Sequence, residues 1–484
     1  MRKNKMTDNQ SAFGEHVILP VVNEVVASAA YGVIDDRLEA FNATGGSTDV
    51  NDNLLRCQSG TSIGGYGVIR TKQSIVYHPG EAIRGRLTGM FTAGVANSLQ
   101  FAGLFSLTET LAFGYDGDDF GIIYERHGKA ECQEIEVTGA AGGAESATVT
   151  LDGDAATANL TATTAAGNAF EIARDCTADA TLGAKWNFFQ NGDKVIAISK
   201  SVGDKTGTMS FSSSTATATV TEKQTGASKT KTLVKRADWN MNTDYVIDPT
   251  KLNIYQIDYG YLGSSSITFS VYDHAASHFI PVHRIENKDL TQTSIGNPSL
   301  KIGWTAASLG SSGTNLVTQG GSASIQKIAI EHQLESGSRA VDFSKTSVGQ
   351  TLTNIITLRN RGHYGYRYNL GNVLPLAFSV NHETTGKKGL LVKIIKNATL
   401  AGVPNFTYSN ENDSIVEYDT AGTDVTNGEL ISSFIIEANG SLYLDIADKI
   451  DGLLPRETLT VAALQIGSGT TDSTDASISW KEDK

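Results

Sequence analysis

The chain has 484 residues, of which 40% are hydrophobic and 19% are charged, with a formal net charge of -13. This length predicts two to four domains, and the acidic balance argues against a general electrostatic surface for nucleic acid. No run of about 18 apolar residues occurs, so we expect no membrane insertion. The start of the chain is polar and does not indicate a signal peptide. The widely spaced Cys57, Cys132 and Cys176 indicate neither a disulfide framework nor a zinc site, which suits synthesis in a reducing cytoplasm.

Short strands separated by turns are predicted for the first 130 residues. Residues 1–30 are expected to form an N-terminal arm, in which Val17–Tyr31 suits either a strand or a short helix. Closely spaced strands are typical of a sandwich or jelly roll, and the turn Asp116-Gly117-Asp118-Asp119 predicts a hairpin. The predicted strands are Val76–His78 before a Pro-Gly turn, Arg86–Phe91, Gln100–Phe105, Leu111–Tyr115 and Phe120–Glu125.

Residues 131–237 differ in composition from the residues before them, being rich in Ala, Thr and Gly. Asp152-Gly153 and Asn191-Gly192-Asp193 predict hairpins in this region. Thr164–Ala178 predicts a helix with one apolar stripe, whose members at i, i+3, i+4 and i+7 are Ala169, Ile172, Ala173 and Cys176. The segment therefore predicts a small inserted α+β module.

The stretch Asn253–Arg284 carries the strongest strand pattern in the chain. Tyr255, Ile257 and Tyr259 alternate with polar residues along the first strand, which predicts a half-buried strand with one face in a core. A second strand, Ile267–Tyr272, completes a hairpin. We expect its partner strands to lie before residue 130, so that the core closes across the inserted module.

These patterns predict a mainly β protein. Residues 31–130 and 238–335 form one discontinuous sandwich domain, interrupted by the module at 131–237. Residues 336–484 form a C-terminal β-sandwich domain. Its predicted strands are Thr353–Arg359, Leu376–Val380, Leu390–Lys396, Ile431–Ile436, Leu442–Ile446 and Thr458–Ile466.

Several residue groups could in principle carry chemistry. His274, His278 and His283 lie near Asp273 as candidate metal ligands, but structural histidines are the favoured interpretation. Asp116, Asp118 and Asp119 could bind calcium, but their spacing lacks the EF-hand pattern and a hairpin turn is favoured. Glu125, Asp258 and Glu331 are available to a glycosidase, but the sequence does not pair them. GxSxG, Walker A, HExxH and Rossmann motifs are absent, so we predict no catalytic residue, no metal and no cofactor.

One aromatic-basic run remains as a candidate binding surface. Arg359-Asn360-Arg361 is followed by Tyr364, Tyr366 and Tyr368. These tyrosines are the predicted contacts with a glycan or with a neighbouring subunit. A strand edge is the plainer interpretation of the same run.

Two blocks of motifs carry a resemblance to a known family. The first contains Tyr77-His78-Pro79-Gly80, Phe91-Thr92-Ala93-Gly94 and Phe113-Gly114-Tyr115-Asp116-Gly117. The second contains Asn253-Ile254-Tyr255-Gln256-Ile257, Phe279-Ile280-Pro281-Val282-His283-Arg284 and Asn297-Pro298-Ser299-Leu300. In this order they resemble virion structural proteins of tailed bacteriophages and related marine viruses, of the tail, fibre or surface-appendage type. Relatives tend to have Trp-Leu-Gly where this chain has Tyr261-Leu262-Gly263.

The resemblance implies a concanavalin-like jelly roll and a non-enzymatic structural role in a virion. The implied protein builds a multimeric surface appendage, a tail fibre or a capsid decoration, as a homo-oligomer for which a trimer is favoured. Its implied partners are other virion proteins. An alternative function is a receptor-binding module that recognises host-surface polysaccharide through exposed aromatic residues. An enzyme that degrades such a polysaccharide is the least favoured alternative.

Overall fold

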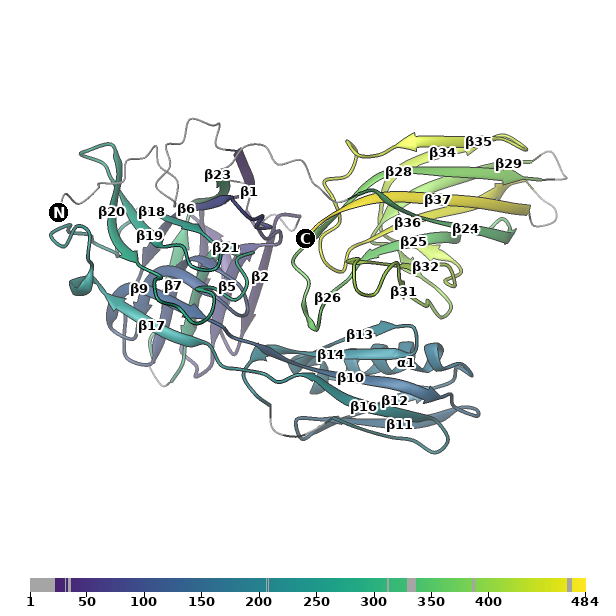
Figure 1. Cartoon of the computed structure of the whole chain (residues 1–484), viewed down its shortest axis with the longest axis horizontal. Helices are drawn as coiled ribbons and strands as arrows, with labels where there is room; N and C mark the ends of the chain where they lie inside the picture. The colour runs from purple at the N-terminus through teal and green to yellow at the C-terminus, as the bar shows by residue number, and fades with distance from the viewer. Residues whose placement is uncertain are drawn as a thin grey trace. The chain divides into compact units, whose positions relative to one another are not determined.

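The computed structural model describes residues 22–30, 32–33, 36–205, 207, 209–310, 313–328, 337–384, 388–467 and 472–484. The chain divides into two compact units. The first unit contains the described residues up to 129 and 227–328, and the second contains 130–226 and 337–484 (Figure 1). Strands dominate both units, so the predicted mainly β class is confirmed. Among the described residues, no helix is long and apolar enough to cross a membrane.

One sheet of the first unit has seven antiparallel strands. Its last strand, β17, follows the inserted module in sequence and pairs with β9, so the chain returns to this sheet before residue 237. In spatial order the strands are β17 (Thr230–Lys235), β9 (Asp119–Arg126), β8 (Thr110–Asp116), β7 (Ser98–Phe105), β21 (Lys301–Ser308), β5 (Tyr66–Thr71) and β2 (Leu38–Ala43).

The other sheet of the first unit has nine strands. β23 (Ser322–Ile328) pairs with both β6 and β1 (Val22–Ser28), so the described part of the predicted N-terminal arm is a strand in this sheet, and residues 1–21 lie outside the described chain. The remaining strands are β20 (His278–Ile285), β19 (Ile267–Asp273), β18 (Asn253–Gly260), β6 (Ala82–Phe91), β22 (Val317–Gly320), β4 (Leu54–Gln58) and β3 (Ser47–Asn51). A single 3-10 turn, η1 (Arg236–Asp238), follows β17 among the described residues.

The two sheets of the first unit pack face to face around an aromatic core. Phe113 on β8 stacks on Tyr255 of β18, with ring centroids 4.6 Å apart, and meets Phe269 of β19 edge-on at 5.5 Å. All three side chains are fully buried, and each contributes roughly 1.5–3 kcal/mol by its removal from water. β18 pairs along its length with β6, which confirms that the hairpin finds its partner before residue 130.

The other face of the hairpin differs from the prediction. Gln256 and Asp258 were expected on an open face, but both are buried, so the half-buried interpretation of this strand is wrong. Both side chains can be buried because they are hydrogen-bonded to other polar groups. Arg84 of β6 donates to Asp258 with Nε and Oδ1 2.6 Å apart, and Gln256 donates to the same carboxylate at 2.7 Å. Hydrogen-bonded pairs of this kind satisfy polar groups that burial would otherwise penalise.

Motif residues from both blocks of the resemblance meet in the first unit. The rings of Tyr77 and Tyr261 lie edge to face, 5.3 Å apart, and the Tyr259 hydroxyl donates to the Pro298 carbonyl at 2.6 Å. The backbone N–H of Tyr77 donates to the Ser299 hydroxyl instead of to a neighbouring strand. Val76–His78 is therefore not a strand, and that prediction is wrong.

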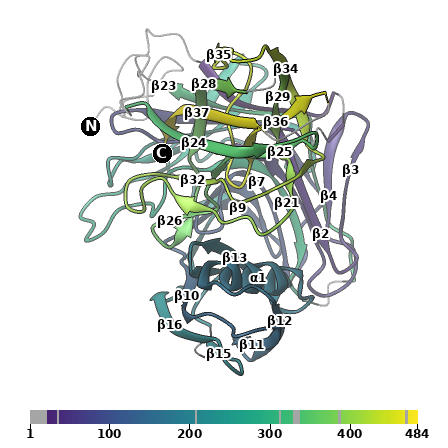
Figure 2. The same cartoon turned by 90° about the vertical axis from the view of Figure 1, so that its right-hand side faces the viewer.

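The inserted module lies in the second unit and has its own hydrophobic core. α1 (Ala165–Ala178) begins after Thr164, whose side chain accepts from the N–H of Gly167, and lies against β12 and β13 (Figure 2). The predicted stripe of Ala169, Ile172, Ala173 and Cys176 is buried, which confirms the helix and its apolar face. The other elements are β10 (Ala130–Gly139), β11 (Glu145–Leu151), β12 (Asp154–Leu160), α2 (Leu182–Lys185), β13 (Trp186–Asn191), β14 (Lys194–Val202), β15 (Ser210–Ser212) and β16 (Thr217–Gln224), in sheets ordered β13-β14-β10-β16 and β12-β11-β15.

The C-terminal part of the second unit is a β-sandwich. One sheet is β24 (Arg339–Val348), β37 (Asp472–Asp483), β28 (Asn372–Glu383) and β35 (Ser441–Asp445). The facing sheet is β31 (Thr407–Tyr408), β32 (Val416–Asp419), β25 (Thr353–Asn360), β36 (Thr458–Ile466), β29 (Gly389–Lys396) and β34 (Glu429–Ile436). Two short pairs complete it, β26 (His363–Tyr364) with β27 (Arg367–Tyr368) and β30 (Thr399–Leu400) with β33 (Val425–Thr426). The predicted sandwich class with an inserted α+β part is confirmed.

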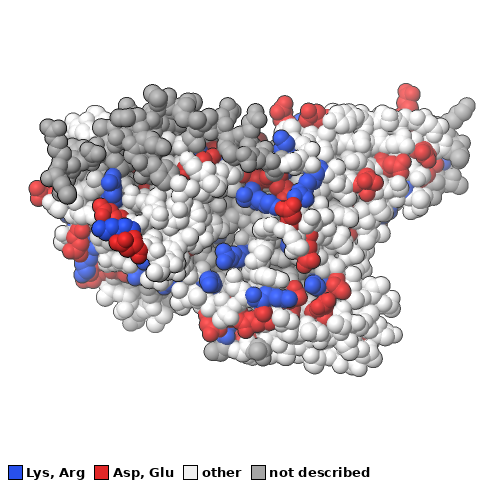
Figure 3. Space-filling view, in the orientation of Figure 1, with Lys and Arg blue, Asp and Glu red and all other residues white. Residues whose placement is uncertain are grey.

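Charge is thinly spread on the face of the molecule drawn in Figure 3. Lys and Arg residues lie interspersed with Asp and Glu residues among large uncharged areas. This face therefore presents no broad field of one sign.

Candidate functional site

Strand β13 of the module contacts the C-terminal sandwich within the second unit. The N–H of Gly192 donates to the Phe406 carbonyl at 3.1 Å, and Gln190 Nε2 donates to Asn405 Oδ1 at 3.1 Å. Asn187 Nδ2 donates to the Tyr368 hydroxyl at 2.7 Å. These contacts hold β13 and the turn after it beside β27 and the residues that precede β31.

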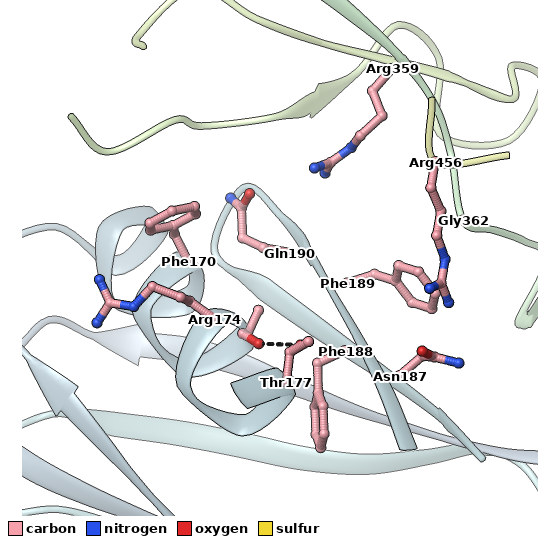
Figure 4. A pocket seen from close by; sticks show the side chains of 11 residues that line it. Phe170, Arg174, Thr177, Asn187, Phe188, Phe189, Gln190, Arg359, Gly362 and Arg456 are labelled. Atoms are coloured by element: carbon pink, nitrogen blue, oxygen red, sulfur yellow. Dashed lines mark hydrogen bonds between the residues drawn. The ribbon is translucent and has the colours of Figure 1, made fainter. Parts of the chain in front are cut away.

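A cavity of about 400 Å³ lies among these elements (Figure 4). The module supplies its aromatic and amide side chains, and the C-terminal sandwich supplies two of its three arginines. The lining consists of Phe170, Ala173, Arg174, Thr177, Asn187, Phe188, Phe189, Gln190, Arg359, Gly362 and Arg456. We call this space the β13 cavity.

Phe189 forms a wall of the β13 cavity and is held from three sides. The guanidinium carbon of Arg456 lies 4.9 Å from the centre of its ring, and the ring of His363 lies 5.3 Å away. Gly362 makes room for the ring, because a Cβ at that position would lie 2.1 Å from Phe189 Cε1. Figure 4 shows the Arg456 guanidinium beside this ring.

Two further arginines of the lining are fixed by acidic neighbours. Arg359 Nε lies 2.7 Å from Glu417 Oε1, and its guanidinium carbon lies 3.5 Å from the centre of the Phe406 ring. Arg174 pairs with Asp175 at 2.7 Å. An arginine anchored in this way loses less conformational freedom when it binds a ligand, so its N–H groups are arranged in advance.

Gln190 carries an unused acceptor beside the β13 cavity. Gln190 is 5% exposed, and its Oε1 is buried and has no hydrogen-bond partner within the described structure. Its Nε2 donates to the carbonyl of Gly192 at 2.7 Å, which fixes the amide. A buried acceptor without a partner costs free energy in the folded state.

Two titratable groups next to the β13 cavity have lowered pKa values. Burial, with the nearby charges of Arg361 and Arg359, lowers the pKa of His363 to about 3. Burial and the charge of Arg456 lower the pKa of Lys200. Burial is the larger cause of both shifts, and the arginine charges add to it.

The three predicted contact tyrosines lie in the β26–β27 hairpin and its turn. Tyr368 points to the module, since its hydroxyl donates to the carbonyl of Ile198 at 3.1 Å, and burial raises its pKa to about 12. The Tyr364 hydroxyl donates to the Asn412 carbonyl at 2.8 Å. Tyr366 is 39% exposed at the tip of the turn. None of the three lines the β13 cavity.

The two arginines of the predicted aromatic-basic run, Arg359 and Arg361, have different surroundings. Arg361 is buried, donates to the Ser414 carbonyl at 2.7 Å and lies 3.6 Å from the centre of the Tyr408 ring. Only Arg359 of this run lines the β13 cavity. The two arginines differ because Arg359 lies within β25, whereas Arg361 follows the end of that strand at Asn360.

The histidines considered as metal ligands do not converge in the described chain. His283 is buried with a pKa lowered by burial, whereas His278 donates to the Ala276 carbonyl in an exposed turn. His274 packs edge-on against the ring of Tyr272. No group of three metal-ligating side chains occurs among the described residues.

The acidic residues considered as calcium ligands or glycosidase carboxylates form ion pairs within the fold. Asp116 and Asp119 close the predicted hairpin, and they pair with Lys231 and Lys235 of β17. Glu125 pairs with Lys229, and Asp258 pairs with Arg84. Glu331 lies outside the described residues.

Most residues that line the β13 cavity were not predicted from the sequence. Phe170, Arg174, Phe189 and Gln190 belong to the module, and Arg456 lies more than 260 positions later in the chain. Each occurs in an ordinary local context. The Phe188-Phe189 pair in a predicted hairpin was the one available signal, because adjacent strand residues cannot both face the same core.

Comparisons with known proteins give no family for this chain. No family model and no curated relative matches. Among solved structures, the chain is similar to the cellulose induced protein Cip1, with 12% identity, 62% of this chain and 96% of that chain covered, and a TM-score of 0.27. It is also similar to a legume lectin-like domain from Entamoeba histolytica (10% identity, 60% and 90% covered, TM-score 0.23) and to peanut lectin (9% identity, 61% and 99% covered, TM-score 0.23). Similarity this low says nothing about a ligand, and the β-sandwich class follows from the strand pairing described above.

Proposed function

We propose that the chain is a non-enzymatic recognition protein that binds a saccharide in the β13 cavity. The observation that carries the proposal is the lining itself, in which aromatic rings, fixed amides and guanidinium groups surround about 400 Å³. Ligand sites are concave, largely apolar and furnished with a few fixed polar groups. A sugar ring presents apolar C–H faces and a rim of hydroxyls, which suits these two kinds of side chain.

The polar groups of the lining match sugar hydroxyls. The Arg359 guanidinium offers donors that Glu417 holds in place, and the Asn187 side chain adds an amide to the lining. Phe170 and Phe189 offer aromatic surface on two sides. Figure 4 shows Phe170, Gln190 and Arg359 around the same space.

A binding role without catalysis is supported by the composition of the lining. None of the described residues that line the β13 cavity is an aspartate, a glutamate or a histidine. Most glycosidases require two carboxylates that flank the scissile bond. We therefore propose that the site binds its ligand without changing it.

A glycan array probed with the full-length chain tests this proposal. We expect a defined set of glycans to bind, and we expect Phe170→Ala to weaken their binding at least fivefold, because the substitution removes an aromatic wall. Phe41→Ala is the matched control, since Phe41 is a partly exposed phenylalanine of the first unit. An array without binding, or equal binding by F170A, would contradict the proposal.

A structural role in a bacteriophage appendage is the second proposal. It is supported by the resemblance of the two motif blocks, whose residues pack against one another in the first unit. It is also supported by the edge strands β34 and β35, where Leu430, Ile435 and Tyr443 are 55%, 70% and 73% exposed. The run Leu430–Ile436 contains no charged residue, although edge strands are commonly protected by charge. We propose that a second copy of the chain covers this edge in a homotrimer.

Mass photometry of the purified chain tests the assembly. We expect trimers for the natural chain and monomers for Ile435→Lys. Val246→Lys is the matched control, because Val246 is an equally exposed apolar residue of the first unit. Trimers of I435K, or monomers of the natural chain at micromolar concentration, would exclude this interface. Absence of the chain from purified particles would exclude the virion role.

A further inference from the structure

We infer that Asn187 selects the saccharide bound in the β13 cavity by accepting a hydrogen bond from one of its hydroxyls, and that Tyr368 is the positioning residue that orients the Asn187 amide. This inference rests on the proposed function. It names the side-chain atom that distinguishes one sugar from another.

Asn187 lies on the outward side of β13, two residues before Phe189. Along β13 the buried Trp186, Phe188 and Gln190 alternate with partly exposed residues, so Asn187 and Phe189 leave the strand on the same side. Both line the β13 cavity, and Figure 4 shows the Asn187 amide near the Phe189 ring. Two residues of an extended strand span roughly 7 Å, so one sugar ring can reach both side chains.

The Tyr368 hydroxyl determines which way the Asn187 amide faces. It lies 3.1 Å from the carbonyl oxygens of both Ile198 and Ser199 on β14, and a carbonyl oxygen can only accept a hydrogen bond. The hydroxyl proton is therefore used there, and the phenol keeps this proton at neutral pH because burial raises its pKa to about 12. The 2.7 Å contact with Asn187 must then be donated by Nδ2 of the amide to the hydroxyl oxygen.

This orientation makes Asn187 Oδ1 the acceptor that is left for a sugar. The bond from Nδ2 to Tyr368 is the one hydrogen bond that the Asn187 side chain makes with the described residues, and Asn187 is only partly buried. Oδ1 leaves the amide carbon in a different direction from Nδ2. A sugar hydroxyl can therefore donate to Oδ1 while the bond to Tyr368 stays intact.

The β26–β27 hairpin holds the module in place around this amide. Tyr368 bonds to β13 and β14, the ring of His363 lies 5.3 Å from that of Phe189, and the Tyr366 ring centre lies 5.8 Å from Lys223 Nζ of β16. One hairpin thus contacts three strands of the module. The acceptor is fixed before the sugar arrives, which reduces the conformational entropy lost on binding.

The test uses the oligosaccharide with the strongest signal on the glycan array and synthetic versions of it that each lack one hydroxyl. We expect one deoxy version to bind the full-length natural chain about tenfold more weakly, because Asn187 Oδ1 would lose its donor. Asn187→Leu keeps the approximate size of the side chain without the acceptor. We expect N187L to bind the parent oligosaccharide only as tightly as the natural chain binds that deoxy version, and not to distinguish the two.

Tyr368→Phe tests the positioning role. We expect Y368F to bind the parent oligosaccharide about threefold more weakly, because Nδ2 would lose its acceptor and the amide could turn over. In the N187L background Y368F should have no further effect on binding, whereas a loosened module would weaken binding in both backgrounds. Tyr364→Phe is the matched control, since the Tyr364 hydroxyl bonds to the Asn412 carbonyl and Tyr364 does not line the cavity. It should bind like the natural chain.

Equal discrimination of the deoxy versions by N187L and by the natural chain, with F170A still defective, would overturn the role of Asn187 and leave saccharide recognition standing. An equal effect of Y368F with and without the Asn187 amide would overturn the positioning role of Tyr368. An array without binding would refute the proposed function and this inference together.

Discussion

Substitution of Gly362 by alanine is the sharpest test of how the module and the C-terminal sandwich shape the β13 cavity. The new Cβ would lie 2.1 Å from Cε1, 2.8 Å from Cδ1 and 2.9 Å from Cζ of Phe189. Carbon atoms in contact lie about 3.5–4.0 Å apart, so the ring must move by about 1.4 Å or more. That movement disturbs its contacts with Arg456 and His363.

We expect Gly362→Ala to lower the free energy of unfolding of the second unit by about 1–3 kcal/mol, the usual cost of overpacking. For a unit of this size, a loss of about 2 kcal/mol lowers the melting temperature by about 4–8 °C. Differential scanning calorimetry of the full-length chain measures the shift. Hydrogen exchange locates it, and faster exchange should be confined to β13 and the β26–β27 hairpin.

A double-mutant cycle identifies Phe189 as the cause. With Phe189→Ala already present, the alanine at position 362 meets no ring, and we expect its further cost to fall below about 0.5 kcal/mol. Gly143→Ala is the matched control, because a Cβ there meets nothing within 4 Å, and we expect it to be neutral. An equal cost of G362A with and without the Phe189 ring would refute this reasoning.

Four other predictions concern the side chains of Asp258, Glu109, His363 and Thr164. Asp258→Ala should lower the free energy of unfolding of the first unit by about 3–5 kcal/mol, because Arg84 would lose its buried carboxylate partner. Chemical denaturation measures this loss, and the double variant R84M/D258L should recover most of it. A double variant without recovery would contradict the assignment. Burial raises the pKa of Glu109 from 4.5 to about 7, so the folded state holds this proton more tightly than the unfolded state does. Stability should therefore fall as pH rises from about 4.5 to about 7, and E109Q should remove that slope. The pKa of His363 is lowered from 6.5 to about 3, so the opposite sign applies: stability should fall as pH decreases from about 6.5 to about 3, and an unchanged slope in H363Q would contradict it. Thr164→Ala removes the N-cap of α1 and should cost about 1 kcal/mol in thermal unfolding, whereas Thr164→Ser should cost little.

Local patterns were sufficient for most elements of the fold. Helix α1 was predicted because its apolar residues recur with the helical period. The hairpins at Asp152-Gly153 and Asn191-Gly192 were predicted because such turns require backbone conformations that glycine adopts easily. The prediction of a strand at Val76–His78 was wrong because its apolar residues are typical of a strand, whereas the backbone N–H of Tyr77 donates to the distant Ser299 side chain.

The candidate site was much less predictable than the elements that carry it. Tyr364, Tyr366 and Tyr368 were selected as a local aromatic run, but the fold uses Tyr368 to join the module. Whether any of them contacts a glycan or a neighbouring subunit stays a prediction. The cavity beside them combines residues from three stretches of chain, and no local period connects such stretches.

The sequence alone determined most of the segments that form strands, the position where the composition changes to that of the inserted module, and the apolar face of the central hairpin that enters a core. These properties depend on neighbouring residues, because side-chain direction and turn chemistry are local. Tertiary structure decided the rest. It buried the polar face of the same hairpin by pairing Arg84 with Asp258, and it brought Phe189 against Gly362 and Arg456. Contacts of that kind join residues far apart in the chain, and their energies depend on distances that only the folded backbone sets.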